Sequence, residues 1–260
     1  MREFPNLEDV DSSPRVAATA GAVLDVSDVG MTRAHALTVI DGGRSSQMFP
    51  WVAGGLLDAA RWQVVAKRAV DILGGAALLI ALLPVILISA LLVRVTSSGP
   101  VLYLQERVGK DGKPIRMYKF RSMRLGAHLT RDELRNLNEV TGPVFKIRQD
   151  PRITPVGRWL RKLSIDEIPQ LINVLRGEMS LVGPRPPLPE EFATYTELER
   201  QRLFVKPGLT CVWQVSGRSD VDFKTWVGMD LEYISTWNLR RDFRLLLKTL
   251  PAVLNGRGAY

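Results

Sequence analysis

The sequence predicts a mainly α-helical protein with one small β-hairpin, an α+β fold that attaches to a membrane from one side as a monotopic protein. Three observations predict this fold class. The segment Ile72–Val93 holds 22 consecutive residues without a charge. Downstream of it, several segments repeat apolar residues at the spacing of amphipathic helices. One pair of neighbouring segments has the composition of two paired strands.

The uncharged segment is long enough for a membrane, because 22 helical residues at about 1.5 Å each reach across a hydrocarbon core roughly 30 Å thick. Pro84 lies near its middle and predicts a kink. The segment has basic residues on both flanks, namely Arg61, Lys67, Arg68, Arg94 and Arg107. A crossing helix prefers one basic flank, so we favour a re-entrant membrane helix over about residues 64–95. A kinked single crossing and a buried helix of a soluble core are the alternatives.

The charge of the chain divides it into two predicted domains. The 260 residues include 35 Lys and Arg against 27 Asp and Glu, a formal net charge of +8. Residues 1–60 carry four basic and eight acidic residues and no sustained periodicity, which predicts a polar, acidic and largely disordered extension. Residues 61–260 carry a net charge of +12 and form the second domain.

The scarcity of cysteine and histidine excludes several kinds of chemistry. One cysteine cannot form a disulfide framework, and two histidines with it cannot supply a four-ligand zinc site. His35 and His128 also leave a histidine-dependent triad little choice. Any chemistry must therefore use carboxylates, Arg, Lys or a divalent cation held by oxygen ligands.

Shorter elements are predicted after the membrane segment. Val101–Arg107 and Pro114–Arg121 flank the Asp-Gly turn of residues 109–112, which is typical of a β-hairpin. Leu129–Val140 is predicted as a short amphipathic helix. Residues 150–155, Asp-Pro-Arg-Ile-Thr-Pro, are predicted as a loop.

The segment Leu163–Gly177 has the clearest helical period, with apolar residues at Ile168, Leu171, Ile172 and Leu175. Gly177 predicts its end. Ser164–Glu167 matches a capping box, but that start would place Pro169 deep in the helix. Asp166 as the N-cap places Pro169 in the first turn, where proline is tolerated.

Three later segments are also predicted to be helical: Glu190–Phe204, Phe223–Ser235 and Arg240–Leu254. The last is basic on one side and apolar on the other, and Trp226 and Trp237 precede it. These features fit an interfacial amphipathic helix at a membrane surface. Packing on the protein core fits them nearly as well.

Asp166 and Glu167 are the candidate catalytic residues. A helix N-terminus and the neighbouring Arg161 and Lys162 should keep both carboxylates ionised, and the same helix end suits a phosphate. A carboxylate and a phosphate held together need a bridging cation, and oxygen ligands favour Mg²⁺. The alternative is that Asp166 only caps the helix and Glu167 only pairs with a cation.

Candidate phosphate ligands lie on turns restricted by Gly or Pro. Arg185 lies in Gly-Pro-Arg-Pro-Pro, Arg218 follows a strand-like segment at 211–215, and Arg152 lies in Asp-Pro-Arg. Arginine on a rigid turn suits bidentate phosphate binding, although a solvated charge is the usual role of such a residue. Lys119 and Arg121 of the hairpin are further candidates, for phosphate or for anionic lipid headgroups.

A series of motifs then appears in a fixed order: Lys67-Arg68 with Asp71, the Pro-broken apolar helix, Gln105–Gly109, Tyr118–Met123, Asp150–Thr154, Leu163–Gln170, Asn173–Leu175, Met179–Pro186, Lys206–Thr210 and Trp213–Arg218. Together they resemble the bacterial sugar transferase family, the monotopic phosphoglycosyl transferases that prime exopolysaccharide and glycan assembly. The resemblance covers about residues 62–260.

The resemblance implies a specific reaction. Family members transfer a sugar-1-phosphate from a UDP-sugar to undecaprenyl phosphate and release UMP. It implies that Asp166, paired with Glu167, attacks the sugar-bearing phosphorus to give a covalent phosphosugar-aspartyl intermediate. It also implies Mg²⁺ at Asp166, and phosphate binding by Arg185 and Arg218.

The resemblance also implies partners and a location. The partners are a UDP-sugar, undecaprenyl phosphate and membrane lipid, with no nucleic acid, and a homodimer is compatible with the sequence. The catalytic domain is expected on the cytoplasmic face of the bacterial inner membrane. Residues 206–223 and 256–260 look most like exopolysaccharide-priming enzymes that use UDP-glucose or UDP-galactose.

The sequence departs from the family pattern in two places. Many members carry Ser before the helix-breaking proline, where this chain has Leu83, and larger members carry an N-terminal bundle of transmembrane helices that residues 1–60 do not resemble. Cys211 has no part in the family mechanism and is expected to be structural. Two other functions remain open: a glycosyltransferase that releases UDP, and a non-catalytic, basic protein that binds anionic lipid.

Overall fold

The computed structural model describes residues 39–41, 44–46, 54–127, 129–130, 133–139, 142–216 and 221–255. The chain divides into the units Met1–Arg33 and Ala34–Tyr260, and every described residue lies in the second. Most of the predicted acidic extension therefore lies outside the described residues. Within it, the backbone of β1 (Val39–Asp41) pairs antiparallel with β2 (Arg44–Ser46).

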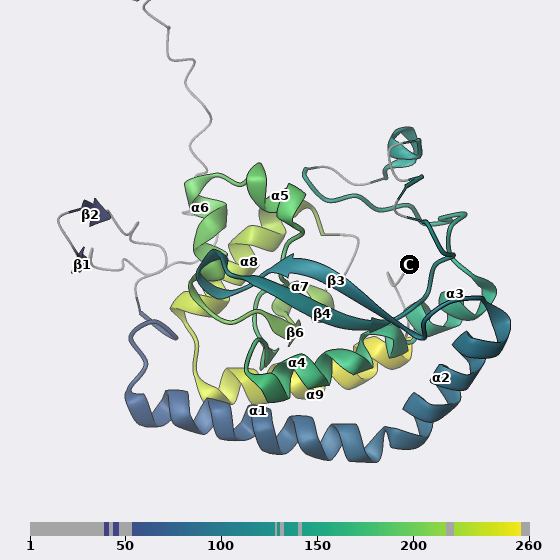
Figure 1. The fold of residues 1–260 in the computed structure, drawn as a ribbon. Coiled ribbons are helices and arrows are strands. Elements are labelled where there is room, and N and C mark those ends of the chain that lie inside the picture. Colours follow the sequence, from purple (N-terminus) through teal and green to yellow (C-terminus); the bar gives the residue numbers. More distant parts are fainter. Residues whose placement is uncertain are drawn as a thin grey trace, which may run out of the picture. The chain divides into compact units, whose positions relative to one another are not determined.

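The uncharged segment forms two helices, α1 (Arg61–Ala81) and α2 (Leu83–Thr96), which meet at an angle of 60° (Figure 1). Pro84 lies in the first turn of α2. It has no N–H to continue the hydrogen bonds of α1 but fits the start of a new helix, so the predicted kink is confirmed. Within the described part of the chain no single helix has the length and hydropathy to cross a membrane, although this bent pair meets both together.

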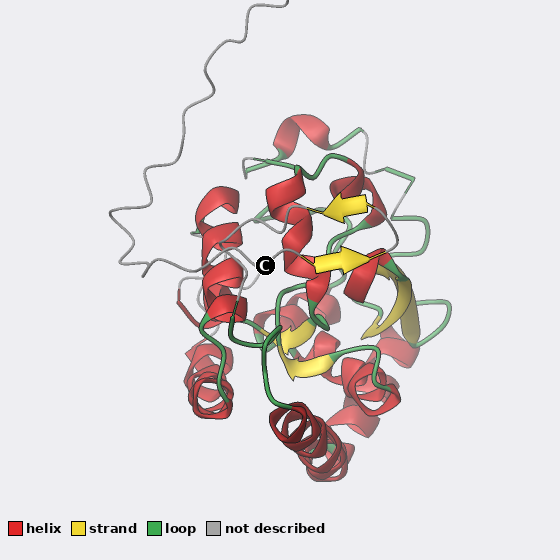
Figure 2. Ribbon diagram, turned by 90° about the vertical axis from the view of Figure 1, so that its left-hand side faces the viewer, coloured by secondary structure: helices red, strands yellow, loops and turns green. Residues whose placement is uncertain are grey.

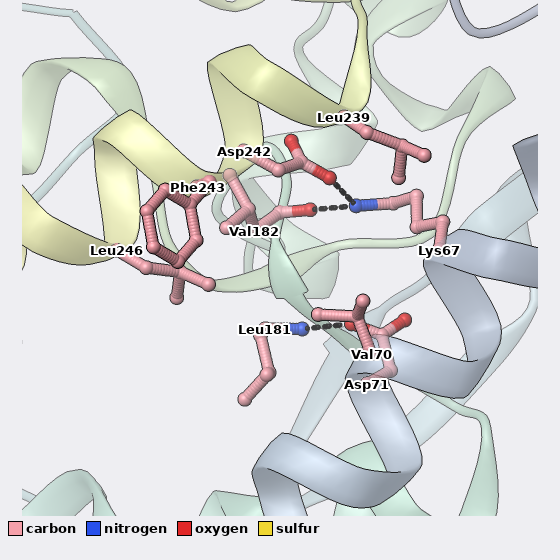
Figure 3. Close-up of a pocket in the computed structure, with 9 residues that line it drawn as sticks. All are labelled: Lys67, Val70, Asp71, Leu181, Val182, Leu239, Asp242, Phe243 and Leu246. Atoms are coloured by element: carbon pink, nitrogen blue, oxygen red, sulfur yellow. Dashed lines mark hydrogen bonds and ion pairs between the residues drawn. The ribbon is translucent and has the colours of Figure 1, made fainter.

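Three buried residues one turn apart, Lys67, Asp71 and Gly75, attach α1 to the rest of the domain. Lys67 Nζ donates to Asp242 Oδ2 at 2.6 Å and to the Val182 carbonyl at 3.1 Å. Asp71 Oδ1 accepts from the Ser180 hydroxyl and from the Leu181 backbone N–H, both at 2.9 Å. Figure 3 shows the second of these bonds. The mostly apolar helix α1 is therefore held in place by the hydrogen bonds and the ion pair of Lys67 and Asp71, which apolar side chains cannot form.

The predicted hairpin is confirmed. Strand β3 (Leu102–Val108) pairs antiparallel with β4 (Pro114–Phe120), in register from Leu102 opposite Phe120 to Val108 opposite Pro114. The turn η2 (Lys110–Gly112) places Asp111 at φ 57° and Gly112 at φ 75°. These are left-handed conformations that Asp tolerates and Gly adopts without strain.

A second strand pair was not predicted. Strand β5 (Ser180–Val182) runs parallel to β6 (Gly208–Thr210). Both strands are three residues long and too short to show a period-2 pattern. Figure 2 shows the strand pairs as small separate sheets.

The C-terminal helices match the prediction closely. Helix α8 (Phe223–Ser235) has the predicted bounds, and α9 (Leu239–Asn255) begins one residue earlier than expected. Trp226 and Trp237 are buried in the main core, and Trp226 packs against Trp213 with ring centroids 4.2 Å apart. Core packing, and not a membrane interface, is therefore the role of these two tryptophans.

Three of the shorter predictions are wrong. The described part of the predicted helix 129–140 contains turns and the short 3-10 helix η3 (Arg135–Leu137). The predicted helix 190–204 is divided into α5 (Pro189–Ala193), α6 (Glu197–Arg200) and the 3-10 helix η5 (Gln201–Phe204). The division has a cause, since Thr196 caps a new helix and accepts from the Glu199 N–H. The strand-like segment at 211–215 is helix α7 (Val212–Ser216).

Helices α1 and α9 together line a pocket of about 180 Å³ (Figure 3). The Lys67–Asp242 ion pair lies at its polar end, and Asp242 also accepts from the Tyr233 hydroxyl at 2.6 Å. The rest of the lining is mostly apolar: Val70, Leu181, Val182, Leu239, Phe243 and Leu246. The ion pair is therefore largely shielded from solvent. Removing one partner of such a pair is costly, because the other charge is left buried and unpaired.

We expect Asp242→Leu to destabilise the purified protein by roughly 3–5 kcal/mol, because it leaves the Lys67 ammonium buried and unpaired. The double variant Lys67→Met with Asp242→Leu should recover most of that loss, since it removes both charges and Tyr233 can still donate to the Val182 carbonyl. Thermal unfolding followed by circular dichroism measures both. A double variant as unstable as the single one would contradict this account.

Candidate active site

The acidic dyad lies in a short 3-10 helix and not at the start of an α-helix. Helix α3 (Pro155–Lys162) ends, and Ser164 reverses the chain with φ 54°. The 3-10 helix η4 (Ile165–Gln170) follows, and α4 (Leu171–Arg176) continues from it. Pro169 has no N–H for an α-helical hydrogen bond, so the α-helix begins only after it.

The predicted N-cap role of Asp166 is therefore wrong. Asp166 lies inside η4, and Ser164 stands at the cap position without a capping hydrogen bond from its side chain. The predicted capping box from Ser164 to Glu167 is likewise absent there. A six-residue 3-10 helix has little dipole to offer a carboxylate, so the charges of neighbouring side chains must set the ionisation of the dyad.

Glu167 receives two cations on one oxygen. Lys119 Nζ, from β4, lies 3.0 Å from Glu167 Oε1, and Arg185, from the turn after β5, lies 3.2 Å from the same atom. Burial alone would raise the pKa of Glu167, but the charges and hydrogen bonds of Lys119 and Arg185 outweigh it and hold that pKa well below its usual range. Glu167 is therefore a fixed anion.

The Asp166 carboxylate lies in different surroundings from that of Glu167. It is only 6% exposed, and no described residue donates a hydrogen bond to it or forms an ion pair with it. Burial raises the pKa of Asp166 and the charge of Glu167 raises it further, whereas Lys119 and Arg161 oppose the shift. Its oxygens are not among the fully buried side-chain atoms of the described residues that lack a partner, so part of the carboxylate faces solvent and is accessible to a bound group.

The donor set suits one kind of metal ion. The described residues contain no group of three or more Asp, Glu, His or Cys side chains arranged to hold a metal. Mg²⁺ often binds through one or two carboxylates, with its other positions filled by water and substrate phosphates. The Asp166 carboxylate, buried and without a bonded partner, fits that pattern.

Asn173 holds the hairpin against the dyad. Its Oδ1 accepts from the Tyr118 N–H at 3.0 Å, and its Nδ2 donates to the Arg116 carbonyl at 2.7 Å and to Glu178 at 2.6 Å. Asn173 is fully buried, and through α4 it fixes the strand that carries Lys119. In the sequence, Asn173 appeared only as the first residue of the Asn173–Leu175 motif, without a role of its own.

The other predicted site residues lie in different surroundings. Arg152 forms a bidentate pair with Asp150 and also donates to the Ala127 carbonyl, and Arg121 donates to the backbone and hydroxyl of Ser97 after α2. Arg121 is buried and Arg152 is partly buried, and both bond within the protein, although Arg121 Nε and Nη1 have no partner among the described residues. Arg218 lies outside the described residues. The structure thus brings together Asp166, Glu167, Lys119 and Arg185, and their role in catalysis stays a prediction.

Arg161 is an addition to this set. Its Nε donates to the Ser122 hydroxyl at 2.9 Å, and its charge acts on Asp166. The sequence showed it only as a neighbour of the dyad along the chain.

Comparison with known proteins agrees with this arrangement. The family described as bacterial sugar transferase matches residues 62–256. The chain belongs to that family. The dyad, Lys119 and Arg185 all lie within the matched residues, and so does the bent helix pair except for its first residue.

Three relatives of this sugar transferase show the range of the family. The exopolysaccharide production protein ExoY of Rhizobium meliloti (strain 1021) is 40% identical over 200 residues, which are 75% of this chain and 88% of that protein. The undecaprenyl-phosphate galactose phosphotransferase of Salmonella typhimurium is 44% identical over 199 residues, 75% of this chain. The undecaprenyl-phosphate glucose phosphotransferase of Komagataeibacter xylinus is 37% identical over 212 residues, 77% of this chain.

The extent of the matches differs. The matched region spans 41% of the Salmonella protein and 38% of the Komagataeibacter protein. It spans 44% of another relative, the galactosyl transferase CpsE of Streptococcus agalactiae. The chain therefore corresponds to less than half of those longer relatives.

We expect Glu167→Gln to lower the pKa of Lys119 further. Burial already lowers that pKa, and the negative charge of Glu167 is the largest influence that raises it again. NMR titration of the protein with its lysines dimethylated by ¹³C measures the shift. Glu106→Gln on the exposed face of β3 removes the same charge and serves as the control. An unchanged Lys119 pKa in Glu167→Gln would contradict the pairing.

Proposed function

We propose that this sugar transferase moves a sugar-1-phosphate, glucose or galactose in type, from a UDP-sugar to undecaprenyl phosphate and releases UMP, as the first membrane step of exopolysaccharide biosynthesis. The observation that carries the proposal is the contrast within the dyad. Glu167 is locked by two cations, whereas Asp166 is buried without a bonded partner. The printed activities of the Salmonella and Komagataeibacter relatives support the substrate class.

The residues have distinct parts in the proposed reaction. A carboxylate oxygen of Asp166 attacks the sugar-bearing phosphorus, the bond from that phosphorus to the UMP oxygen breaks, and UMP leaves with the electron pair. A phosphate oxygen of undecaprenyl phosphate then attacks the same phosphorus and frees Asp166. The covalent intermediate allows a soluble donor and a lipid acceptor to use one site in turn.

The surrounding cations fit the charge of this chemistry. Lys119 and Arg185 converge on the dyad, where they can balance the negative charge that an incoming diphosphate adds. Asp166 would hold Mg²⁺, which would supply further charge neutralisation when bound. Arg218 is proposed as a second phosphate ligand.

The location is proposed from the way the bent helix pair is attached. Lys67 near the start of α1 bonds to Asp242, and Ser97 just after α2 accepts from Arg121 of the same folded domain. Helix α2 exposes the apolar residues Leu87, Ile88, Leu91, Leu92 and Val95. Two ends tied to one domain with an apolar stretch between them support a re-entrant helix, with the domain on the cytoplasmic face of the inner membrane where UDP-sugars are found.

A glycosyltransferase that releases UDP is the second candidate, because the Streptococcus agalactiae relative carries the printed name galactosyl transferase. The nucleotide product separates the two functions. Release of UMP supports phosphosugar transfer, and release of UDP would replace it with sugar transfer alone.

The covalent step has a direct test. With Mg²⁺, a UDP-sugar labelled in its β-phosphate and no lipid, we expect label to be trapped on the protein. Asp166→Asn should abolish trapping, because an amide is a poor nucleophile. Asp111→Asn in the exposed hairpin turn makes the same chemical change where Asn tolerates the left-handed backbone, and should trap label normally. An active preparation that traps no label would exclude the aspartyl intermediate.

Topology is tested by labelling introduced cysteines. We expect Val64→Cys and Ser98→Cys to react with a membrane-impermeant maleimide from the cytoplasmic side only, since both ends of the helix pair are tied to one domain. Permeabilised cells show that both thiols are reactive. Labelling of the two positions from opposite sides would establish a crossing helix.

A further inference from the structure

The turn that presents Arg185 depends on hydrogen bonds from elsewhere in the fold. Three of the four residues in Pro184–Pro187 are prolines and have no N–H to donate, so the turn can be held mainly through its carbonyls. All four carbonyls accept a bond. The donors, in order along the turn, are the Gly208 N–H, the guanidinium of Arg202, the guanidinium of Arg107 and the Val108 N–H.

The donor to the Arg185 carbonyl is itself rigidly held. The Arg202 side chain is fully buried, and its Nε and Nη2 bind Asp230 Oδ2 at 2.8 and 2.7 Å. Its Nη1 donates to the Tyr195 hydroxyl at 3.0 Å, and its Nη2 reaches the Arg185 carbonyl at 3.2 Å. Asp230 also accepts from the indole N–H of Trp226 at 2.9 Å. All three guanidinium nitrogens are therefore engaged.

This arrangement is costly if stability alone is its purpose. Taking two charges fully out of water carries a desolvation penalty that apolar side chains of similar size would avoid. The planar fork of arginine, however, binds several acceptors in fixed directions at once. One guanidinium here joins α8, η5 and the turn that carries a site residue.

Fixing the Arg185 carbonyl also fixes the Arg185 side chain. Pro186 restricts Arg185 to an extended backbone but does not set its ψ angle within that range. The carbonyl carbon and Cβ share one Cα, so a held carbonyl oxygen sets the direction in which the side chain leaves the turn. The Arg185 side chain extends from there to Glu167, where its Nη1 lies 3.2 Å from Oε1.

We propose that Arg202, held by Asp230, is a positioning residue that aims Arg185 at the donor diphosphate. It acts through the backbone of the turn and touches no substrate. This inference rests on the proposed function, because the ligand of Arg185 is taken to be the UDP-sugar.

The kinetic test compares two variants of the same network. Arg202→Lys keeps a charge for Asp230 but loses the fork, and it should raise KM for the UDP-sugar about tenfold, the usual size of one charge-assisted hydrogen bond, with kcat changed much less. Tyr195→Phe removes a bond on the side of Arg202 away from the turn and should leave KM within about twofold. A purely structural role would lower kcat through loss of folded protein and leave KM unchanged.

A double-mutant cycle shows whether the effect passes through Arg185. In an Arg185→Gln background, Arg202→Lys should cause no further rise in KM, because the side chain that it positions is gone. Equal effects of Arg202→Lys in both backgrounds would overturn the proposal. If Arg202→Lys does not fold, Asp230→Asn makes the same test, since it retains Arg202 but loosens it.

Hydrogen exchange separates this inference from the proposed function. The Val108 amide donates to the Pro187 carbonyl of this turn, and a peptide that contains Val108 reports on the turn. Arg202→Lys should speed exchange in that peptide and Tyr195→Phe should not. Unchanged exchange in Arg202→Lys refutes positioning whatever the enzyme's activity, and faster exchange in a protein that forms no UMP refutes the proposed function alone.

Discussion

The partly buried carboxylate of Glu167 is the group on which the geometry of the site depends. It draws together Lys119 of β4 and Arg185 of the turn after β5, two cations separated by 66 positions in the chain. Without that anion the two cations would repel each other in a region of low dielectric, and Arg107 nearby would add to the repulsion. Lys119 and Arg185 can therefore lie close together because the Glu167 carboxylate lies between them.

A small number of polar contacts likewise fixes the position of the bent helix pair. Its apolar side chains supply little direction, because dispersion and burial act without orientation. The direction comes from Lys67 and Asp71 on α1 and from the Arg68 guanidinium, which donates to the carbonyls that end α4. Helix α4 continues from the dyad, so Arg68 and Asn173 connect the helix pair and the hairpin to one short segment beside Asp166.

The sequence predicted those parts of the fold that have a strong local signal, namely a proline within a long apolar segment, an Asp-Gly turn between strand-like segments, or a sustained helical period. The Pro84 break, the β3–β4 hairpin and α8 are found as expected. It failed where a few residues decide the structure, as at Pro169, which delays the α-helix, and Thr196, which starts a new one. Site residue types could be named from their motifs, but the pairing of Lys119 with Glu167 depends on a tertiary contact that has no local signature.

The distribution of satisfied and unsatisfied groups around the dyad is itself informative. Glu167, Asn173, Arg185 and Arg202 are each fixed by two or more polar contacts. Asp166 stands among them without one from any described residue, although it is less exposed than Glu167 or Arg185. The Asp166 oxygens are not among the fully buried atoms without a partner in the described residues, so a bound phosphate and cation can reach them. Because the neighbouring side chains are already held by other polar contacts, that carboxylate is left available to a bound group.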